Sequence, residues 1–209
     1  MKLGGKLEIK SPQKIAKFLH EEHTGRIASI DDNGFPQIIP MNFVYIDSCV
    51  YMHSHIRGEK LDNIARNSKV GFEVDRELEF LPSYFEDPKD ASFADTLYVS
   101  VIIKGNASVV TDLKEMTRAL NGLMEKYQPE GRYEKILDTD DVLSYVTVIK
   151  VIPKQIRGKY KVGQNIKIGK RKELAKKIFE RNSHAIKTLE IMGFDIKNNT
   201  PIMTSEPNW

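Results

Sequence analysis

The sequence predicts a mainly β protein of the α+β class, an antiparallel barrel with helices packed outside it. Segments rich in β-branched residues follow one another along the chain, with few helical segments between them. The residues DDNG between two such segments form the strongest hairpin signal. Sequential strands with few helices favour an antiparallel barrel over a parallel, doubly wound sheet.

The composition is that of a soluble globular protein. A chain of 209 residues suits one domain, or one domain with an appendage. The formal charge of +3 does not by itself indicate nucleic acid. No apolar run approaches the roughly 20 residues of a membrane helix, and MKLGGKLEIK lacks a signal-peptide core. The single cysteine, Cys49, excludes an internal disulfide, and we expect a cytoplasmic protein without a membrane partner.

The first element predicted is a helix that starts at Ser11-Pro12. Serine can cap a helix, and proline fits the first helical position. His20 and His23 follow at helical spacing, but two glutamates stand between them, and HEEH is not the zinc-protease arrangement. We therefore interpret this run as a solvated face and predict no metal site.

Two strands are expected next, Arg26–Ile30 and Gln37–Tyr45, joined by the DDNG turn. Pro40 lies inside the second, and proline cannot donate to a strand ladder, so this strand should lie at an edge or a bulge. Main-chain groups of Pro40, Met41 and Asn42 would then be free to bind a planar ligand. The alternative is an edge strand that proline protects from aggregation, and this segment alone favours that alternative.

The stretch Val50–Asn67 changes from strand to helix. Residues alternate at period two until Gly58, after which apolar residues recur at helical spacing. The first backbone N–H groups of such a helix are unpaired. With Lys60 in the first turn and Arg57 before it, they could bind a phosphate or carboxylate. An ordinary strand–helix junction with solvated basic side chains explains the pattern equally well.

The middle of the chain is predicted to continue with strands and one helix. Glu77–Asp95 has little periodicity and is expected to be a long surface loop. Asp112 should cap a helix that ends near Tyr127. The strands expected around these segments are Val70–Val74, Thr96–Val110 with a bend at Gly105, and Ser144–Ile156.

The end of the chain is expected to be a helical extension. From Lys170 the sequence becomes helical and lysine-rich, which suits either a nucleic-acid or membrane surface or, more simply, the solvated side of a docked helix. The tail Asn198–Trp209 shows no periodicity, and Trp209 is either disordered or a terminal anchor. We expect a barrel domain at residues 1–161 and the extension at 162–209.

Four blocks in this order resemble the pyridoxamine 5′-phosphate oxidase-like, FMN-binding split-barrel superfamily. They are GRIASI, DDNGFPQIIPMNFVY, VYMHSHIRGEKLDNIARNSKVGFEV and TLYVSVIIKGNASVV, and IRGKYKVGQN resembles the tails of related members. The likeness spans roughly Gly25 to Lys161 and is strongest to the 5-nitroimidazole-resistance, flavin-nucleotide-binding group. It implies an antiparallel split β-barrel and a homodimer with FMN at the subunit interface.

The resemblance also implies which residues contact FMN. The strand before the glycine would run under the flavin, and Gly58 and Lys60 would meet the phosphate, with Arg57 as a possible second cation. The strand with Pro40 would face the isoalloxazine. The cofactor-binding residues implied are Pro40, Met41, Asn42, His53, Ser54, His55, Arg57, Gly58, Lys60, Ser100, Gln164 and Asn165. No catalytic residue is identified.

The function implied is that of an FMN-dependent oxidoreductase. The arginines that hold the substrate phosphate in pyridoxamine phosphate oxidases proper have no matching run here, which favours a generic flavin reductase. A nicotinamide nucleotide would bind transiently, since no Rossmann fingerprint is present, and would reduce an acceptor such as a nitroaromatic or quinone. The alternatives are a flavin carrier, sensor or transcriptional regulator, or a barrel that holds haem or a deazaflavin instead.

Overall fold

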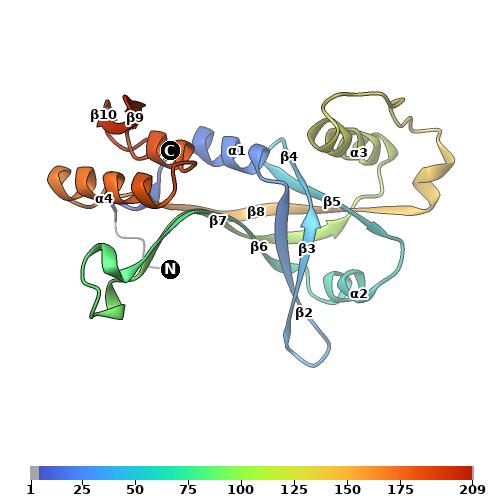
Figure 1. Ribbon diagram of the computed structural model, residues 1–209. Helices are drawn as coiled ribbons and strands as arrows, with labels where there is room; N and C mark the ends of the chain where they lie inside the picture. Colours follow the sequence, from blue (N-terminus) through green and yellow to red (C-terminus); the bar gives the residue numbers. More distant parts are fainter. Residues whose placement is uncertain (1–4, 209) are drawn as a thin grey trace. The chain divides into compact units, whose positions relative to one another are not determined.

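The computed structural model describes residues 5–208 (Figure 1). The expectation for Trp209 lies outside these residues. The described chain divides into two compact units, which we call the barrel unit (residues 15–74 and 101–157) and the terminal unit (residues 5–14, 75–100 and 158–208). The predicted domain boundary after residue 161 stays a prediction.

The helices and strands follow one another in the order drawn in Figure 1. The strands are β1 (Glu8–Ile9), β2 (Thr24–Ile30), β3 (Pro36–Asn42), β4 (Val44–Ile46), β5 (Cys49–His55), β6 (Lys69–Leu81), β7 (Asp95–Val109), β8 (Val146–Lys161), β9 (Phe194–Lys197) and β10 (Thr200–Met203). The helices are α1 (Pro12–Glu21), α2 (Glu59–Arg66), α3 (Leu113–Tyr127), α4 (Ile168–Arg181) and α5 (Ile186–Ile191). Short 3₁₀ turns cover Ser83–Phe85, Ala91–Phe93 and Asp141–Ser144.

One curled sheet carries most of these strands, in the order β3-β2-β6-β7-β8-β5-β4, with β1 beside β8. The pairings of β2 with β3 and β6, of β4 with β5, and of β5 with β8 are antiparallel. The prediction of a mainly β, antiparallel split barrel with peripheral helices is therefore confirmed. The long strands β6, β7 and β8 each continue from one unit into the other.

The hairpin β2–β3 forms where the DDNG turn predicts it. Gly34 takes a φ of 86°, and the Asp31 carboxylate accepts hydrogen bonds from the backbone N–H groups of Asn33 and Phe35. β3 is an edge strand, as the proline predicts. Its ladder with β2 continues through Pro40, so the irregular point is Phe43, which separates β3 from β4.

The prediction of a loop over Glu77–Asp95 is wrong in its first part, because β6 continues to Leu81. Two glutamates there hide the alternation of a strand. Glu79 is only 8% exposed, and it accepts hydrogen bonds from Arg181 at 2.9 Å and from Asn182 at 3.2 Å. A paired carboxylate can occupy an inward position that periodicity assigns to an apolar residue.

The tail also contains a strand that the sequence interpretation missed. β10 pairs with β9, and Asn198 and Asn199 between them take φ values of 48° and 58°. Two positive φ values are typical of a type I′ hairpin turn, which asparagine tolerates. Strands of four residues are too short for their alternation to be recognised. β8 likewise extends past the predicted end at Ile156, and Gly158 pairs with Ile9 of β1.

Each unit has its own apolar core. In the barrel unit, the buried face of α3, including Met116 and Leu120, packs against Val44, Tyr51 and Val148 of the sheet. In the terminal unit, the core is formed by α4, α5, β9 and the ends of the long strands and includes Leu97, Ile178, Leu189, Met192 and Phe194. No helix among the described residues combines the length and apolar character needed to cross a bilayer.

Candidate functional site

The candidate site is built on the end of β5. His53 and His55 are exposed, whereas Ser54 between them is buried, as alternation along a strand requires. His55 Nδ1 accepts a hydrogen bond of 3.2 Å from the backbone N–H of Arg57. The two histidines therefore share one face of β5, and the chain turns directly after them.

Gly58 allows the strand to turn into α2. Its φ of 148° and ψ of 153° lie in a region that side chains rarely adopt. Its carbonyl accepts hydrogen bonds from the N–H groups of Leu61 and Asp62. No side chain caps this end of the helix. The first backbone N–H groups of α2 are therefore without a side-chain acceptor, as a phosphate site requires.

Lys60 connects this helix end to the edge strand. Its Nζ lies 3.5 Å from Sδ of the buried Met41, and the lysine is half-buried. Burial lowers the pKa of Lys60, because the charged amine loses part of its hydration. No carboxylate among the described residues pairs with it. A half-buried cation without an anion thus lies at the start of α2.

Asn63 fixes α2 on the hairpin, a role that the sequence interpretation missed. It is 1% exposed, and its Nδ2 donates to Ser29 Oγ and to Gln37 Oε1, both at 3.3 Å. Its Oδ1 accepts from Arg66 at 2.7 Å. The one available signal was an amide at a position next to the apolar stripe of the helix. Asn63 is a positioning residue, since it sets where Lys60 lies relative to β3.

A pocket of about 200 Å³ opens beside the histidine face. Asn42 of β3 and His53 of β5 supply its polar groups. The remaining lining is mostly apolar and comes from α3 and the segment after it: Leu120, Leu123, Met124, Tyr127 and Ile136. The structure therefore brings two residues from separate predicted strands together at a mostly apolar hollow.

Lys126 and Tyr127 of α3 form hydrogen bonds with Phe43, the residue that separates β3 from β4. The Tyr127 hydroxyl accepts a hydrogen bond of 2.8 Å from the Phe43 N–H. Lys126 Nζ donates to the carbonyls of Leu19 at 2.9 Å and Phe43 at 3.0 Å, and it lies 3.7 Å from the centre of the Phe43 ring. Burial lowers the pKa of Lys126 to about 8. The sequence interpretation missed both roles, because nothing local pairs position 43 with position 127.

The remaining residues predicted to contact FMN do not line the pocket beside His53. Pro40 and Arg57 are exposed in the barrel unit, whereas Ser100, Gln164 and Asn165 belong to the terminal unit. The Gln164 side chain is bonded within the terminal unit: Oε1 accepts from Val162 N–H and Nε2 donates to the Tyr160 carbonyl, both at 2.8 Å, and Nε2 also donates to the Lys6 carbonyl at 3.2 Å. Within residues 5–208, no group of three or more His, Cys, Asp or Glu side chains is arranged to hold a metal ion.

Solved structures of other proteins share this fold. A candidate 5-nitroimidazole antibiotic resistance protein from Bacteroides thetaiotaomicron is 23% identical with a TM-score of 0.61, over 73% of this chain and 86% of its own. The flavocytochrome Anf3 from Azotobacter vinelandii is 15% identical with a TM-score of 0.65, over 77% and 72%. An FAD- and haem-binding protein from Mycobacterium smegmatis is 15% identical with a TM-score of 0.62, over 74% and 73%.

The fold and the site define a split-barrel protein with a basic helix end beside an exposed strand face. The sequence model of the family described as pyridoxamine 5′-phosphate oxidase matches residues 11–160. The chain therefore belongs to the pyridoxamine 5′-phosphate oxidase family. No curated protein matches the chain.

Proposed function

We propose that this protein binds FMN across β3, β5 and the start of α2, and that it is an FMN-dependent oxidoreductase. Electrons would pass from a nicotinamide nucleotide to a small acceptor such as a nitroaromatic or a quinone. The family match supports the proposal, and so does the structural likeness to a candidate 5-nitroimidazole antibiotic resistance protein and to an FAD- and haem-binding protein. FMN is proposed over FAD because a terminal phosphate suits the start of α2.

The observation that carries this proposal is the unpaired, half-buried Lys60 beside the uncapped start of α2. Burial of a cation without a partner is unfavourable, and a dianionic phosphate would stabilise its charged form. The N–H groups of the first turn add hydrogen-bond donors in the same place. These residues fit the phosphate end of a flavin mononucleotide.

The other side chains would position the cofactor and the acceptor. A bound flavin supplies hydride storage between donor and acceptor. His53 and His55 present two imidazoles on one face of β5, and Asn42 adds an amide at the mouth of the pocket. The apolar lining from α3 suits a flat, weakly polar acceptor.

We further propose a homodimer with FMN at the subunit interface. The edge strand β3 and the strand face around His53 are exposed in the single chain, as a shared site requires. Ser100, Gln164 and Asn165 are the residues that a partner subunit would add. Size measurement by light scattering tests this: a dimer is expected, and a monomer that retains one FMN per chain would contradict it.

The charge pairing of α4 does not favour the alternative that this lysine-rich helix binds nucleic acid in a transcriptional regulator. Five basic residues of this helix pair with carboxylates: Lys170 with Glu86, Arg171 with Glu206, Lys176 with Glu180, Lys177 with Glu173 and Arg181 with Glu79. Paired lysines release fewer counterions and attract phosphate backbones weakly. The solvated side of a docked helix is therefore the better interpretation of this segment.

The decisive experiment is the visible spectrum of the purified protein, with the released chromophore identified by mass. A yellow protein that yields FMN, about one per chain, is expected. Anaerobic reduction by a nicotinamide nucleotide and reoxidation by a nitroaromatic or quinone then tests turnover.

Three outcomes would contradict parts of the proposal. Released FAD, haem or a deazaflavin would replace FMN as the cofactor. Flavin that is reduced chemically but never by a nicotinamide nucleotide would indicate a carrier or sensor. A colourless protein that fails to take up added FMN would overturn the oxidoreductase proposal entirely.

A further inference from the structure

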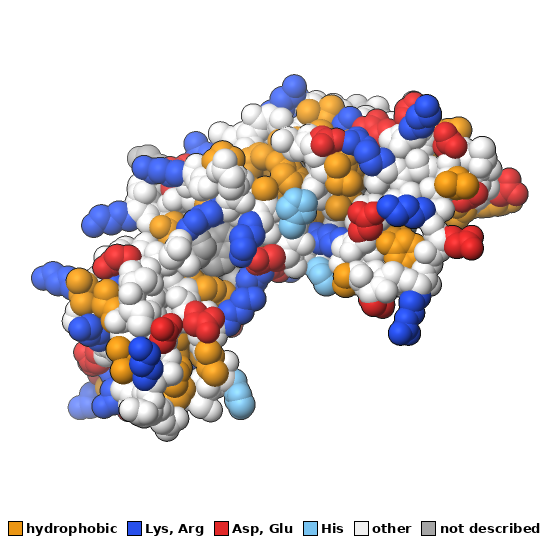
Figure 2. All heavy atoms as spheres, turned by 90° about the horizontal axis from the view of Figure 1, so that it is seen from above, with side chains coloured by type: hydrophobic (Ala, Val, Ile, Leu, Met, Phe, Trp, Pro, Cys, Tyr) orange, Lys and Arg blue, Asp and Glu red, His pale blue; other side chains and the backbone are white. Residues whose placement is uncertain are grey.

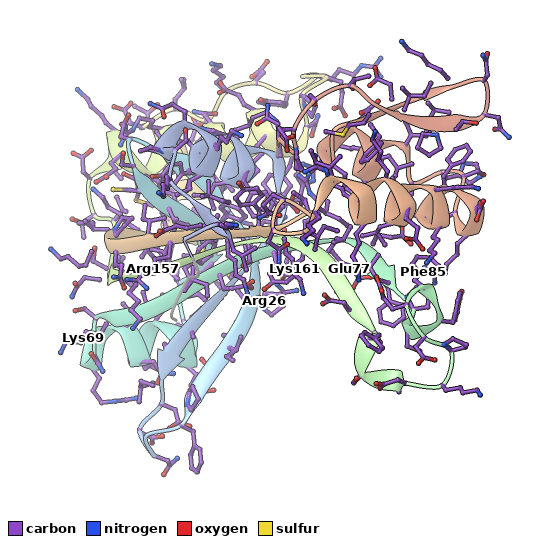
Figure 3. The ribbon with its side chains drawn as sticks, turned by 90° about the vertical axis from the view of Figure 1, so that its left-hand side faces the viewer. Arg26, Lys69, Glu77, Phe85, Arg157 and Lys161 are labelled. Carbon is purple, nitrogen blue, oxygen red and sulfur yellow. The ribbon has the colours of Figure 1, made fainter. Side chains whose placement is uncertain are left out.

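A second hollow, separate from the candidate flavin site, lies on three neighbouring strands of the barrel unit. Its volume is about 430 Å³, within the range of small-molecule sites. Strands β6, β7 and β8 each contribute one lysine to its wall: Lys69, Lys104 and Lys154. The rest of the lining is Val70, Gly71, Gly105 and Asn106. Figure 3 labels Lys69, which lies at the start of β6.

The three lysines have no counter-charge. No acidic residue lines the hollow, and none of the three ammonium groups has an ion pair or hydrogen bond within the described chain. Other basic residues of the same unit are paired, as Lys150 with Glu115 at 2.7 Å and Arg26 with Glu73 at 3.1 Å. Three like charges around one hollow produce a local positive potential that attracts an anion.

Two glycines and a hydrogen-bonded asparagine contribute to the lining between the lysines. A Cβ on Gly105 would lie 2.5 Å from the Ile152 carbonyl oxygen, so close packing of β7 on β8 requires glycine there. A Cβ on Gly71 would lie 3.7 Å from the Cβ of Ala28, which is an ordinary contact. Asn106 is held in place, since its Nδ2 donates to Ser68 Oγ at 2.8 Å. The three lysines therefore border a lining in which Gly105 is closely packed and Asn106 is hydrogen-bonded.

From these observations, we infer that this hollow is a binding site for a small anion that carries phosphate groups, such as a nucleotide or another phosphorylated metabolite. Lysine ammonium groups bind phosphate as point charges, and three of them from separate strands suit a group with several oxygens. Lys60 does not line this hollow, so the inference does not depend on the proposed flavin site.

Calorimetric titration of sodium pyrophosphate into the 209-residue chain, with FMN present in excess, tests the inference. Saturable binding of about one pyrophosphate per chain is expected, because added FMN occupies the other phosphate site. Lys104→Gln with Lys154→Gln should weaken it by about tenfold or more, which is about 1.4 kcal/mol, and Lys69→Gln should weaken it further. Lys172→Gln, an exposed lysine of α4, is the matched control and should leave binding unchanged.

Circular dichroism confirms that each variant is folded, whether or not it binds flavin. Absence of saturable pyrophosphate binding would overturn the inference, and so would equal binding by the wild type and the triple variant. Tighter binding of duplex DNA that the same three substitutions abolish would also overturn it, in favour of a nucleic-acid surface. None of these results depends on whether the flavin turns over.

Discussion

Lys60 is the residue on which the proposed cofactor site depends most. It reaches from the first turn of α2 to Met41 on β3, and burial lowers its pKa. A phosphate beside it would form a charge-assisted contact, which contributes about 1.5–3 kcal/mol. Replacement of Lys60 by alanine therefore distinguishes a lysine that contacts phosphate from one with a purely structural role.

Lys60→Ala is expected to weaken FMN binding by about tenfold or more, because it removes the cation next to the phosphate. Fluorescence titration of the flavin-free protein with FMN measures the change. Lys114→Ala, at an exposed lysine in the first turn of α3, is the control and should bind FMN like the wild type. Unchanged affinity in Lys60→Ala would show that the phosphate is held elsewhere.

Lys126 makes stability depend on pH. Its pKa is about 8 in the folded protein, because it is buried, against about 10.4 in an unfolded chain. Between these values the unfolded state binds more protons, so the free energy of unfolding rises with pH. The charged form is unfavourable in the fold below pH 8, and this penalty is relieved as the amine loses its proton.

The wild type should therefore gain stability relative to Lys126→Met between pH 8 and about 10.4. The expected gain is on the order of 1 kcal/mol, after allowance for partial exposure of the amine. Urea unfolding of both proteins at several pH values measures it. A difference between the two proteins that stays constant over this range would contradict the prediction.

At the scale of elements, α3 is fixed by its first turn. The Asp112 carboxylate accepts a hydrogen bond of 2.7 Å from the Glu115 N–H and caps the helix. Glu115 then accepts from the Tyr51 hydroxyl at 2.6 Å and pairs with Lys150 at 2.7 Å. The hydrogen bond from Lys150 is the main reason why the pKa of Glu115 is lowered. These contacts dock α3 on β5 and β8 and so place the pocket beside His53.

Asp112→Ala should destabilise the protein by about 1 kcal/mol, because the first turn of α3 loses its acceptor. The melting temperature should fall by roughly 2–4 °C, as measured by scanning calorimetry. Asp112→Asn keeps an oxygen acceptor and should retain most of the stability. Equal losses in the two variants would show that charge, rather than the cap, stabilises this end.

At the scale of the whole molecule, the formal net charge is small. On the face that Figure 2 shows, acidic, basic and hydrophobic side chains are intermixed. The formal charge of +3 agrees with this mixture. A bound ligand is therefore expected to influence stability more than long-range electrostatics does.

Removal of flavin should lower the melting temperature. A ligand at about 100 times its dissociation constant stabilises the folded state by about 2.7 kcal/mol, which corresponds to roughly 5–10 °C for a chain of this size. Calorimetry of stripped and FMN-reloaded protein measures the shift. The control is Lys60→Ala, which should show a smaller shift at the same FMN concentration. No shift in the wild type on reloading would contradict specific binding.

Much of the fold follows from local pattern. The β2–β3 turn, the glycine before α2 and the Asp112 cap all depend on residues within a few positions of one another, and each is present as predicted. The edge position of β3 likewise follows from Pro40, because proline lacks the donor that a second ladder needs. For the candidate site, the family resemblance of the sequence implied the residues that contact FMN, and these contacts stay a prediction.

Only the tertiary structure decided which residues distant in the sequence contact one another. Glu79 can be buried in β6 only because Arg181 and Asn182 reach it. Asn63, Lys126 and Tyr127 acquire their roles from partners on other elements. The lysines 69, 104 and 154 meet only because β6, β7 and β8 are neighbours in the sheet. The periodicity of the sequence indicates on which face of the sheet a residue lies, whereas the order of the strands decides which residues are neighbours on that face.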